Sequence, residues 1–571
     1  MDGARTLPEV IRDRARLAPG APAFTYLPDG ERVAATLSFG ELDAEVRALA
    51  ATLLERAQPG DRALLLYPHG LDFVRAFLAC LYTGIVAVPA YPPRLGDRHG
   101  AAPAQRVASD CDASLLLTTA EAAERVRAWG ALQTLATDMP ALAAVSDWEP
   151  RPVRPDHLAF LQYTSGSTAA PKGVMVTHGN LLHSERMIAS AFGHTSASTF
   201  VDWLPLYHDM GLVGSLLQPL YVGAHSVLMP PEAFLQQPAR WLRAISHFGG
   251  RTGGGPNFAY ELCVRRVRPE QLEGVDLSGW EIAFNGAEPV RASTLETFSA
   301  VFAPWGFRRE AFYPCYGLAE VTLFASGGRK LERPSRLEVD AERLKAGRAV
   351  PTECGVRLVS SGRAWLDRRI EIVDPVDGTR CAEGIVGEIW LMGADVARGY
   401  WNRHDETAQS FGARLDDGDG PFLRTGDLGF MRGEELVVTG RLKDLIVVAG
   451  RNVYPQDIED TVEQSSPLIR SGCSAVFSYE RGGTEHVAVV AELRATEPDD
   501  PATVIRRIRE QVGLRHGLSL SDVALIEAGT LDKTSSGKVR RSACRRRLLD
   551  GKLQLVSASS LPVPAEAEGA V

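Results

Sequence analysis

A run of hydroxyl residues and glycines carries the clearest chemistry in this chain of 571 residues. It reads Y-T-S-G-S-T-A-A-P-K-G and extends from Tyr163 to Gly173, after an apolar strand-like run and before a helix that Thr177 could cap. Small residues let a backbone approach an anion closely, with N–H groups and hydroxyls as donors, and Lys172 adds a mobile positive charge. The spacing to the lysine does not fit a Walker loop. Composition alone indicates a solvated turn, so the ordered string is what predicts an anion-binding loop.

Later segments add polar groups that suit a nucleotide. Tyr316 and Glu320 lie in C-Y-G-L-A-E, which offers an aromatic face for a base and a carboxylate for Mg²⁺, a hard cation that prefers oxygen ligands. Asp427, in R-T-G-D, is an acidic acceptor suited to ribose hydroxyls. Arg441 begins R-L-K-D, and Lys538 follows a flexible glycine near the C-terminus. Each string alone is usually a turn, but all of them in this order are hard to obtain by chance.

Length and charge narrow the class of protein. At about 150 residues per domain, the chain has room for three or four domain-sized units. The 62 Lys and Arg residues against 71 Asp and Glu residues give a net charge of −9, which provides no general field for nucleic acid. The eight cysteines are scattered and lack zinc-site spacing, which indicates reduced thiols. Without a signal peptide or an apolar run of membrane-spanning length, we expect a soluble cytoplasmic protein.

The elements that must hold the first motif alternate between strand and helix. The apolar runs Arg62–Tyr67 and Ile85–Ala90 predict buried strands, and the pattern of Leu71–Tyr82 between them predicts a helix. Strands and helices that alternate at this spacing are typical of βαβ units with parallel sheets. Beyond Arg369 the pattern changes to hairpins, with an Asp377-Gly378 turn.

A second change follows Gly440. The apolar runs Cys473–Ser478 and His486–Leu493 flank a turn-rich segment, and an amphipathic helix over Pro501–Val512 comes after them. This arrangement predicts a small α+β domain near the C-terminus. We therefore expect an N-terminal core over 1–440 with an insertion at about 327–360, a C-terminal domain over 441–550 and a flexible tail over 551–571.

Taken together, the motifs resemble those of the adenylate-forming superfamily of acyl-CoA synthetases, luciferases and peptide-synthetase adenylation domains. The resemblance extends along nearly the whole chain short of the tail. Within it, the fatty acyl-AMP ligases look most similar, through D-W-L-P-L-Y-H-D-M-G from Asp202, G-G-P-N-F-A-Y from Gly254 and F-N-G-A-E-P from Phe284. The insertion falls where that subfamily carries an extra segment.

The resemblance implies an α/β fold with a large N-terminal domain of parallel-rich sheets, a small β-barrel, and a smaller mobile α+β domain. It also implies a reaction in which a fatty acid attacks the α-phosphate of ATP and gives an acyl-adenylate. Tyr316 would stack on adenine, Asp427 and Arg441 would take the ribose, and Glu320 would bind Mg²⁺. The implied nucleotide-binding residues are Thr164, Ser165, Gly166, Ser167, Thr168, Lys172, Asn285, Gly286, Ala287, Glu288, Tyr316, Gly317, Leu318, Ala319, Asp427 and Arg441.

Three further roles follow from the same resemblance. Lys538 would reach from the C-terminal domain to the carboxylate and the α-phosphate, where a preorganised cation acts most strongly. His208 would line the boundary between nucleotide and acyl chain, although a histidine in a loop is often only structural. Lys443 matches the hinge about which the C-terminal domain rotates between half-reactions. Two residues depart from the common pattern, Asp532 in place of proline and Ala319 in place of threonine, and neither removes a reacting group.

The resemblance also bears on the acceptor of the acyl group. Fatty acyl-AMP ligases typically load the phosphopantetheine thiol of an acyl carrier protein, and no Gly-x-Asp-Ser carrier string occurs here, so a carrier would act in trans. Five arginines after Lys538 could dock an acidic carrier, although such a run is more often a solvated helix face. The alternatives are a fatty acyl-CoA synthetase, a catalytically silent nucleotide-binding homologue and an amino-acid adenylation domain. The last predicts an aspartate for the substrate amine, and 234–255 offers no obvious candidate.

Overall fold

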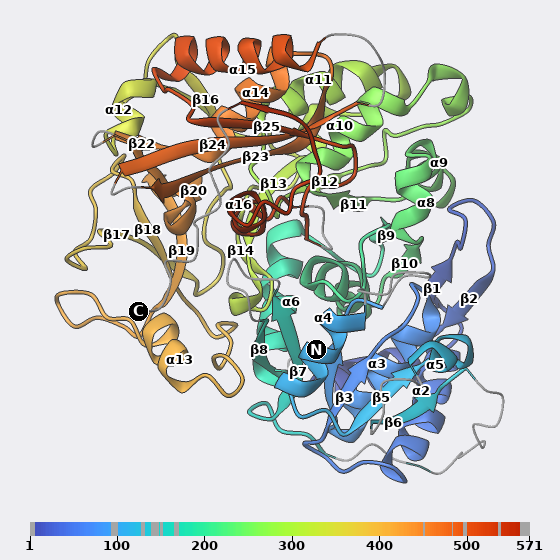
Figure 1. The fold of residues 1–571 in the computed structure, drawn as a ribbon. Coiled ribbons are helices and arrows are strands. Elements are labelled where there is room, and N and C mark those ends of the chain that lie inside the picture. The colour runs from blue at the N-terminus through green and yellow to red at the C-terminus, as the bar shows by residue number, and fades with distance from the viewer. Residues whose placement is uncertain are drawn as a thin grey trace.

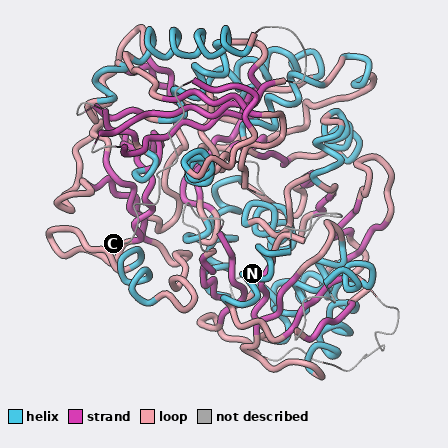
Figure 2. Tube along the Cα trace, viewed as in Figure 1, coloured by secondary structure: helices cyan, strands magenta, loops and turns pink. Residues whose placement is uncertain are grey.

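The computed structural model describes most of the chain. The described residues are 6–92, 101–126, 132–138, 148, 152–164, 171–448, 451–481, 484–494, 500–534 and 538–559. Figure 1 shows the described elements before residue 140 gathered at one end of the molecule, and most of those after residue 455 gathered at the other. Between these ends the strands of several sheets run through the interior, with helices outside them (Figure 2). The fold class is α/β with a large N-terminal and a smaller C-terminal domain, as the sequence predicted.

A six-stranded sheet holds the end of the anion-binding loop. Its strand order is β6-β5-β3-β4-β7-β8, parallel except for the antiparallel pair β7 and β8. The strands are β3 (Arg62–Leu65), β4 (Val86–Pro89), β5 (Leu115–Thr118), β6 (Gln133–Ala136), β7 (Leu158–Thr164) and β8 (Lys172–Thr177). The predicted helix is α3 (Leu71–Thr83), which connects β3 to β4 and is buried along most of its length. The predicted βαβ unit is therefore confirmed.

An eight-stranded sheet carries most of the other motifs at its strand ends. Its order is β14-β13-β12-β11-β9-β10-β1-β2, and the pairs from β13 to β1 are parallel. The strands are β1 (Pro22–Tyr26), β2 (Ala35–Ser38), β9 (Thr199–Asp202), β10 (His225–Leu228), β11 (Thr252–Gly255), β12 (Ile282–Asn285), β13 (Phe312–Gly317) and β14 (Phe324–Gly327). Since ligands bind at the carboxyl ends of parallel strands, Asn285 and Gly317 end their strands where a site is expected.

Helices pack on these sheets and complete one large apolar core. Trp241, Trp280, Tyr260 and Phe298 are fully buried in it and meet edge to face. The helices are α1 (Leu7–Leu17), α2 (Phe39–Leu54), α4 (Ala101–Asp110), α5 (Ala120–Val126), α6 (His178–Phe192), α7 (Gln218–Val222), α8 (Pro231–Gln236), α9 (Ala239–Phe248), α10 (Asn257–Arg266) and α11 (Ala292–Phe302). Thr177 caps α6, because its hydroxyl accepts a hydrogen bond from the Asn180 N–H, as the sequence predicted.

The expected small barrel corresponds to a four-stranded antiparallel sheet of order β17-β18-β19-β20. Its strands are β17 (Arg369–Val373), β18 (Gly387–Met392), β19 (Leu423–Arg432) and β20 (Glu435–Arg441), and α13 (His404–Phe411) precedes β19. The predicted hairpin is present, with Arg369 opposite Met392. Single bridges from Arg363 to Gly327 and to Glu435 join this sheet to β14.

The insertion forms a small unit of its own. It contains β15 (Arg336–Val339), α12 (Ala341–Lys345) and β16 (Val356–Val359), with the two strands antiparallel. Its Leu337, Val339 and Leu344 pack in one apolar cluster with Leu428, Phe430, Val437 and Tyr454. The insertion therefore contacts both the antiparallel sheet and the segment that follows it.

The C-terminal segment forms a separate α+β layer. Its sheet has the order β23-β24-β25-β26, from β23 (Ile469–Arg481), β24 (Thr484–Leu493), β25 (Asp522–Ile526) and β26 (Leu555–Ser559). Before it come β21 (Ile446–Val448) and β22 (Arg451–Val453), and the helices are α14 (Pro455–Ser465), α15 (Pro501–His516) and α16 (Arg541–Leu549). Val476, Val489, Ile508 and Leu525 lie in its core. The predicted strands and amphipathic helix are confirmed.

The expectation of a flexible tail from residue 551 is incorrect for residues 555–559. These residues form β26, which pairs antiparallel with β25 and covers its open edge. Backbone groups at an open edge gain hydrogen bonds from such pairing, which composition does not reveal. Residues 560–571 lie outside the described residues. Across the described part of the chain, no helix is long and apolar enough to cross a membrane.

Candidate active site

The loop between β12 and α11 brings polar groups to the end of the large sheet. Asn285 ends β12 and is fully buried, and its Oδ1 has no hydrogen-bond partner among the described residues. Ala287 adopts a φ of 67°, which is uncommon for a residue with a side chain and is often found at functional turns. Glu288 Oε1 accepts a hydrogen bond of 2.6 Å from the Phe258 N–H, and burial raises the pKa of this carboxyl group. Gly286 lies between Asn285 and Ala287.

Gly286 is required by close packing. A Cβ at this position would lie 2.8 Å from the carbonyl oxygen of Cys315 on the neighbouring strand β13. Gly317 is similar, since a Cβ there would lie 1.9 Å from the Leu323 carbonyl oxygen. The backbone turns sharply after Gly317, through Leu318 and the buried Ala319, because the Leu318 N–H donates to the same Leu323 carbonyl at 2.9 Å. These contacts fix the segment between Tyr316 and Glu320.

Asp427 joins Tyr316 and Arg441 in one hydrogen-bonded group. The Tyr316 hydroxyl donates to Asp427 Oδ2 at 2.7 Å, and Arg441 Nε donates to Asp427 Oδ1 at 2.9 Å. Asp427 and Arg441 lie opposite each other on β19 and β20, so the antiparallel register sets this pair. Asp427 is buried, whereas the Arg441 side chain is 56% exposed, and Asp427 raises the pKa of Arg441. The group thus offers a fixed carboxylate beside an aromatic ring.

Glu320 and Lys172 approach each other through Tyr400. The Tyr400 hydroxyl donates to Glu320 Oε1 at 2.9 Å, and Lys172 Nζ lies 5.1 Å from the centre of the Tyr400 ring. Lys172 also forms an ion pair with Glu406, and it lies opposite Thr164 on the paired strands β7 and β8. The structure therefore joins the lysine of the predicted anion-binding loop to the predicted Mg²⁺ ligand. Ser165, Gly166, Ser167 and Thr168 lie outside the described residues.

A metal at Glu320 would need ligands from the nucleotide. Among the described residues, no group of three or more His, Cys, Asp or Glu side chains could hold a metal ion. Burial raises the pKa of Glu320, so a nearby cation would favour its charged form. Mg²⁺ is typically held by one or two carboxylates together with phosphate oxygens and water. The single carboxylate of Glu320, close to Lys172 of the predicted anion-binding loop, fits that pattern.

His208 lies at the entrance of an irregular helix. The π-helix η2 (Met210–Leu217) follows it, and Asp209 accepts from the Met210 N–H at 2.8 Å. His208 Nδ1 lies 3.2 Å from Asp209 Oδ1, and the His208 side chain is 28% exposed. Burial raises the pKa of Asp209, but hydrogen bonding to His208 and the nearby charges outweigh this, so its pKa lies below the ordinary value. π-Helical turns occur frequently at functional sites.

Lys538 comes from the C-terminal segment and faces groups from the N-terminal one. Its ammonium group is within electrostatic reach of Asp209, Glu288, Asp427 and Arg441. Burial lowers the pKa of Lys538, the Arg441 charge lowers it further, and the three carboxylates oppose both effects. The Lys538 N–H donates to Thr534 Oγ1 at 3.0 Å, which holds the backbone of Lys538 near Thr534. Carboxylates from three of the N-terminal motifs therefore act on the charge of this lysine.

The apolar side of the site is aromatic. Trp203 stacks on Phe234 with ring centres 4.0 Å apart, and Phe258 lies 6.1 Å from Trp203 at a steep angle. A Cβ on Gly255 would lie 2.8 Å from Trp203 Cζ2, so a glycine is needed for this packing. Phe258 is also the residue whose N–H binds Glu288. The aromatic cluster therefore adjoins the polar loop directly.

One residue predicted from the sequence, Lys443, lies apart from the residues described above. Two other residues near the site, Tyr400 and Asp209, were not predicted. Lys443 is exposed on η7 (Leu442–Asp444), while its neighbour Asp444 binds Arg541 at 2.9 Å. Tyr400 was not predicted from the sequence, because its place in the site depends on tertiary contacts with Glu320 and Lys172. Asp209 directly follows His208 in the sequence, but only the fold shows that its Oδ1 lies 3.2 Å from His208 Nδ1.

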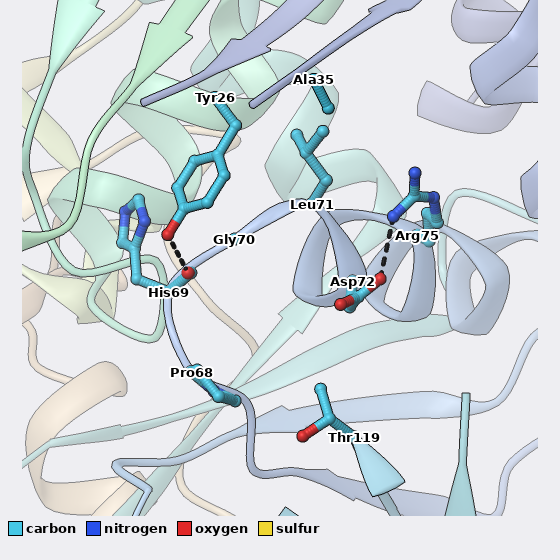
Figure 3. A pocket seen from close by; sticks show the side chains of 9 residues that line it. All are labelled: Tyr26, Ala35, Pro68, His69, Gly70, Leu71, Asp72, Arg75 and Thr119. Carbon is cyan, nitrogen blue, oxygen red and sulfur yellow. Dashed lines mark hydrogen bonds and ion pairs between the residues drawn. The ribbon is translucent and has the colours of Figure 1, made fainter. Parts of the chain in front are cut away.

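Two cavities lie away from this group of residues. One of about 240 Å³ opens at the start of α3, and Figure 3 shows Tyr26, His69, Arg75 and Thr119 around it. The Tyr26 hydroxyl donates to the His69 carbonyl at 2.6 Å there. A second, of about 200 Å³, lies between α12 of the insertion and the C-terminal segment. Neither is lined by the sequence-predicted site residues, so the site is defined by its converging side chains.

Comparison with known proteins identifies the family of this chain. A family model described as AMP-binding enzyme matches residues 11–401, and a model described as the AMP domain of Disco-interacting protein 2-like proteins matches residues 443–558. The chain belongs to the AMP-binding enzyme family. The resemblance to fatty acyl-AMP ligases inferred from the motifs is confirmed by the relatives and solved structures.

Two relatives and one solved structure illustrate the similarity. The medium-chain-fatty-acid–[acyl-carrier-protein] ligase JamA of Moorena producens is 43% identical over 96% of this chain and 96% of its own. The ligase of the same description from Teredinibacter turnerae, TtuA, is 36% identical over 93% and 91%. A fatty acyl-adenylate ligase from Legionella pneumophila, solved with acyl adenylate and pyrophosphate, is 39% identical with a TM-score of 0.76 over 98% of both chains.

The first prediction concerns Lys538. In Lys538→Ala we expect acyl-adenylate formation to slow by about 10²- to 10³-fold, because a preorganised charge at the reacting phosphate is lost. ATP binding should persist, and isothermal calorimetry checks this alongside pyrophosphate release. Lys533→Ala is the matched control, since Lys533 lies in the same hairpin and its Nζ contacts Cys473 Sγ at 3.2 Å. Equal rates in the two variants would contradict the assignment.

The second prediction concerns pH. Because burial lowers the pKa of Lys538, its ammonium should lose its proton at a lower pH than an ordinary lysine does. The value of kcat/KM for adenylation, which reports on ionisable groups of the free enzyme, should therefore decline as the pH rises. In Lys538→Arg that decline should disappear, since a guanidinium stays protonated. If kcat/KM declined identically at high pH in wild type and in Lys538→Arg, the decline would belong to another group.

The third prediction concerns Gly211. A Cβ there would lie 2.2 Å from the Pro205 carbonyl oxygen, which accepts the His208 N–H at 3.1 Å. Gly211→Ala should displace His208 and lower the rate of adenylation. Gly214→Ala in the same π-helix is the control, because its Cβ would make an ordinary contact of 3.5 Å with Leu323. Thermal unfolding measured on both variants separates a lost site from a lost fold, and unchanged activity in Gly211→Ala would argue against the role of this turn.

Proposed function

We propose that this protein activates a fatty acid with ATP to give fatty acyl-AMP and pyrophosphate, then transfers the acyl group to the phosphopantetheine thiol of an acyl carrier protein. The observation that carries the proposal is the approach of Lys538 to Asp209, Glu288 and the Asp427–Arg441 pair. The acyl-carrier-protein ligases and acyl-adenylate ligases among its relatives support the same substrate class.

The first step moves charge toward the pyrophosphate. A fatty acid oxygen forms a bond to the α-phosphorus of ATP, the bond from that phosphorus to the bridging oxygen breaks, and pyrophosphate leaves. No proton moves, since the acid reacts as its carboxylate. We assign the Lys538 ammonium to the charge that gathers on the α-phosphate, and Lys172 with its loop to the leaving phosphates. Glu320 would hold Mg²⁺, which neutralises phosphate charge when bound.

The remaining contacts orient the nucleotide and the acid. We assign the Tyr316 ring to adenine, with Asn285, Gly286, Ala287 and Glu288 along the edge of the base. The unused lone pairs of Asp427 would accept from the ribose hydroxyls, with Arg441 beside them. The aromatic cluster of Trp203, Phe234 and Phe258 favours an apolar acid, because burial of alkyl surface there is favourable by about 0.8 kcal/mol per CH₂.

In the second step the thiol sulfur bonds to the acyl carbon. The C–O bond to phosphate breaks, AMP leaves and the thiol proton passes to water. We propose that the C-terminal domain, 441–550, rotates about Lys443 against the core, 1–440, to admit the thiol. The apolar packing of the insertion against Tyr454 supports the view that this rotation is restrained. Such restraint favours a carrier that brings its own docking surface over free coenzyme A, which is the second candidate acceptor.

The arginines after Lys538 divide into two groups. Arg541 binds Glu459 and Asp444, and Arg547 binds Asp532 at 3.0 Å, so these two stabilise the domain itself. Arg540, Arg545 and Arg546 are exposed. We propose that these three face an acidic carrier protein. All eight cysteines are free, which suits a reaction in the reducing cytoplasm.

The experiment that tests the function uses the whole chain with ATP, Mg²⁺ and fatty acids of increasing length, read by mass spectrometry. Parallel reactions contain no acceptor, coenzyme A, or a phosphopantetheinylated acyl carrier protein. We expect acyl-AMP without an acceptor, acyl-carrier with the protein, and little acyl-CoA. Efficient acyl-CoA formation would assign the protein as a synthetase instead. No adenylate from any fatty acid would contradict the substrate class and direct attention to amino and aryl acids.

A further inference from the structure

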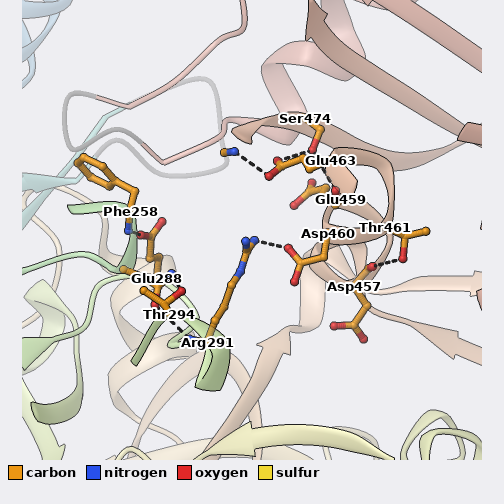
Figure 4. Close-up of polar contacts among 12 residues, drawn as sticks. Phe258, Glu288, Arg291, Thr294, Asp457, Glu459, Asp460, Thr461, Glu463 and Ser474 are labelled. Atoms are coloured by element: carbon orange, nitrogen blue, oxygen red, sulfur yellow. Dashed lines mark hydrogen bonds and ion pairs between the residues drawn. The ribbon is translucent and has the colours of Figure 1, made fainter. Parts of the chain in front are cut away.

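Arg291 is anchored firmly on the N-terminal side of the site. It directly precedes α11, three residues after Glu288, and its backbone N–H donates to Asn257 Oδ1 at 3.1 Å. One of its guanidinium nitrogens lies 3.7 Å from the Glu261 carboxylate on α10. The loop that carries Glu288 therefore continues into an arginine that points away from the nucleotide residues and toward the C-terminal segment (Figure 4).

On the other side of the boundary, helix α14 presents several acidic side chains, and one of them meets Arg291. Asp460 forms an ion pair with the Arg291 guanidinium (Figure 4). Its neighbours are engaged within their own domain. Glu463 accepts from the Gly472 N–H and from Ser474 Oγ, each at 2.8 Å, and Glu459 accepts two hydrogen bonds from Arg541 at 2.7 and 2.6 Å. Asp460 thus differs from these two in having its ionic partner across the boundary.

Asp460 is connected to the Lys538 segment through a short series of side-chain contacts. Glu459, the residue before Asp460, holds Arg541, and Arg541 opens α16 only three residues after Lys538. Arg541 also binds Asp444 at 2.9 Å, beside the Lys443 position proposed as the hinge. The position of α14 is therefore coupled to that of Lys538 through the side chains of Glu459 and Arg541.

We propose that Arg291 and Asp460 form a positioning pair that seats the C-terminal domain with Lys538 against the nucleotide residues, and that this pair serves adenylation but not acyl transfer. The inference rests on the proposed function, because it divides that reaction into its two half-reactions. In the first half-reaction the pair is closed. In the second, rotation of the C-terminal domain opens it.

The electrostatics of the pair suit a contact that closes and opens. The Arg291 and Asp460 side chains are each 33% exposed, so water can solvate both charges when they separate. Burial raises the pKa of Asp460 to about 7, against the lowering effect of Arg291, while Glu463, Asp457 and Glu459 raise it further. Among these neighbours Arg291 is the group that favours the charged form of Asp460, so charge on Asp460 favours the seated arrangement. A fully buried pair would instead hold the domains together in both half-reactions.

The test compares Arg291→Met, Asp460→Asn and the double variant with the conservative Arg291→Lys. We expect kcat for acyl-AMP formation to fall about 5- to 50-fold in each of the first three, since couplings between sites typically have that size. The double variant should be no worse than either single one. Arg291→Lys should recover most of the rate. The KM for ATP and the transfer of a supplied acyl-adenylate to the carrier protein should stay unchanged, which a distorted nucleotide loop would not allow.

A matched control and a readout that does not depend on activity complete the design. Arg380→Met removes an exposed arginine that binds Asp419 at 2.7 Å within the N-terminal region, and it should leave both half-reactions unchanged. Spin labels carried by non-canonical residues at the exposed Val376 and Leu514 report the distance between the domains. Wild type should give a narrow distribution that broadens in Asp460→Asn and stays narrow in Arg380→Met.

Three outcomes would overturn the positioning role. The first is an unchanged rate of adenylation in Arg291→Met and Asp460→Asn. The second is an equal loss of rate in both half-reactions. The third is a distance distribution that is the same in Asp460→Asn as in wild type. Failure of the proposed function is distinguishable from all three, because wild type would then make no fatty acyl-AMP. The distance measurement still decides on the pair in that case.

Discussion

The charge of Lys538 is balanced across the boundary between the two domains. Lys538 follows Thr534 and precedes Arg541 in the C-terminal segment, yet the carboxylates within its electrostatic reach, Asp209, Glu288 and Asp427, all belong to the N-terminal region. An ammonium group withdrawn from water is costly unless opposite charges surround it. The proposed site therefore depends on contact between the two domains. The other contacts across the boundary, from Arg291 with Asp460 to the insertion with Tyr454, gain their importance from this requirement.

The N-terminal region supplies a rigid half-site for this lysine. Parallel strands deliver Asn285 and Tyr316 to one edge, and the antiparallel pair β19 and β20 sets Asp427 opposite Arg441. Glycines at 286 and 317 keep the backbone close enough for these strands to meet. Tyr400 then links Glu320 to the lysine of the anion-binding loop. In the proposed mechanism, seating of the C-terminal domain adds Lys538 to these N-terminal groups.

Local patterns were sufficient for much of the fold and for the motif residues. The apolar periodicity of 71–82 predicted α3, Thr177 predicted the start of α6, and the Asp377-Gly378 turn predicted the hairpin of β17 and β18. Long-range contacts were beyond such patterns. The pairing of Tyr400 with Glu320 and of Arg291 with Asp460 joins residues far apart in the sequence, and β26 forms because an edge of β25 needs a partner. Charge and spacing identify candidate groups in the sequence, but only the tertiary structure shows which groups pair with one another.

The most direct measurement is a crystal structure of the whole chain with a fatty acyl sulfamoyl adenosine, which mimics the acyl-adenylate without reacting. We expect adenine against the Tyr316 ring, ribose hydroxyls donating to Asp427, and Lys538 Nζ about 3 Å from an oxygen of the acyl sulfamate. The alkyl chain should lie along Trp203 and Phe258. A ligand bound with its ribose away from Asp427, or a Lys538 directed to solvent while Arg291 and Asp460 stay paired, would contradict the proposed site.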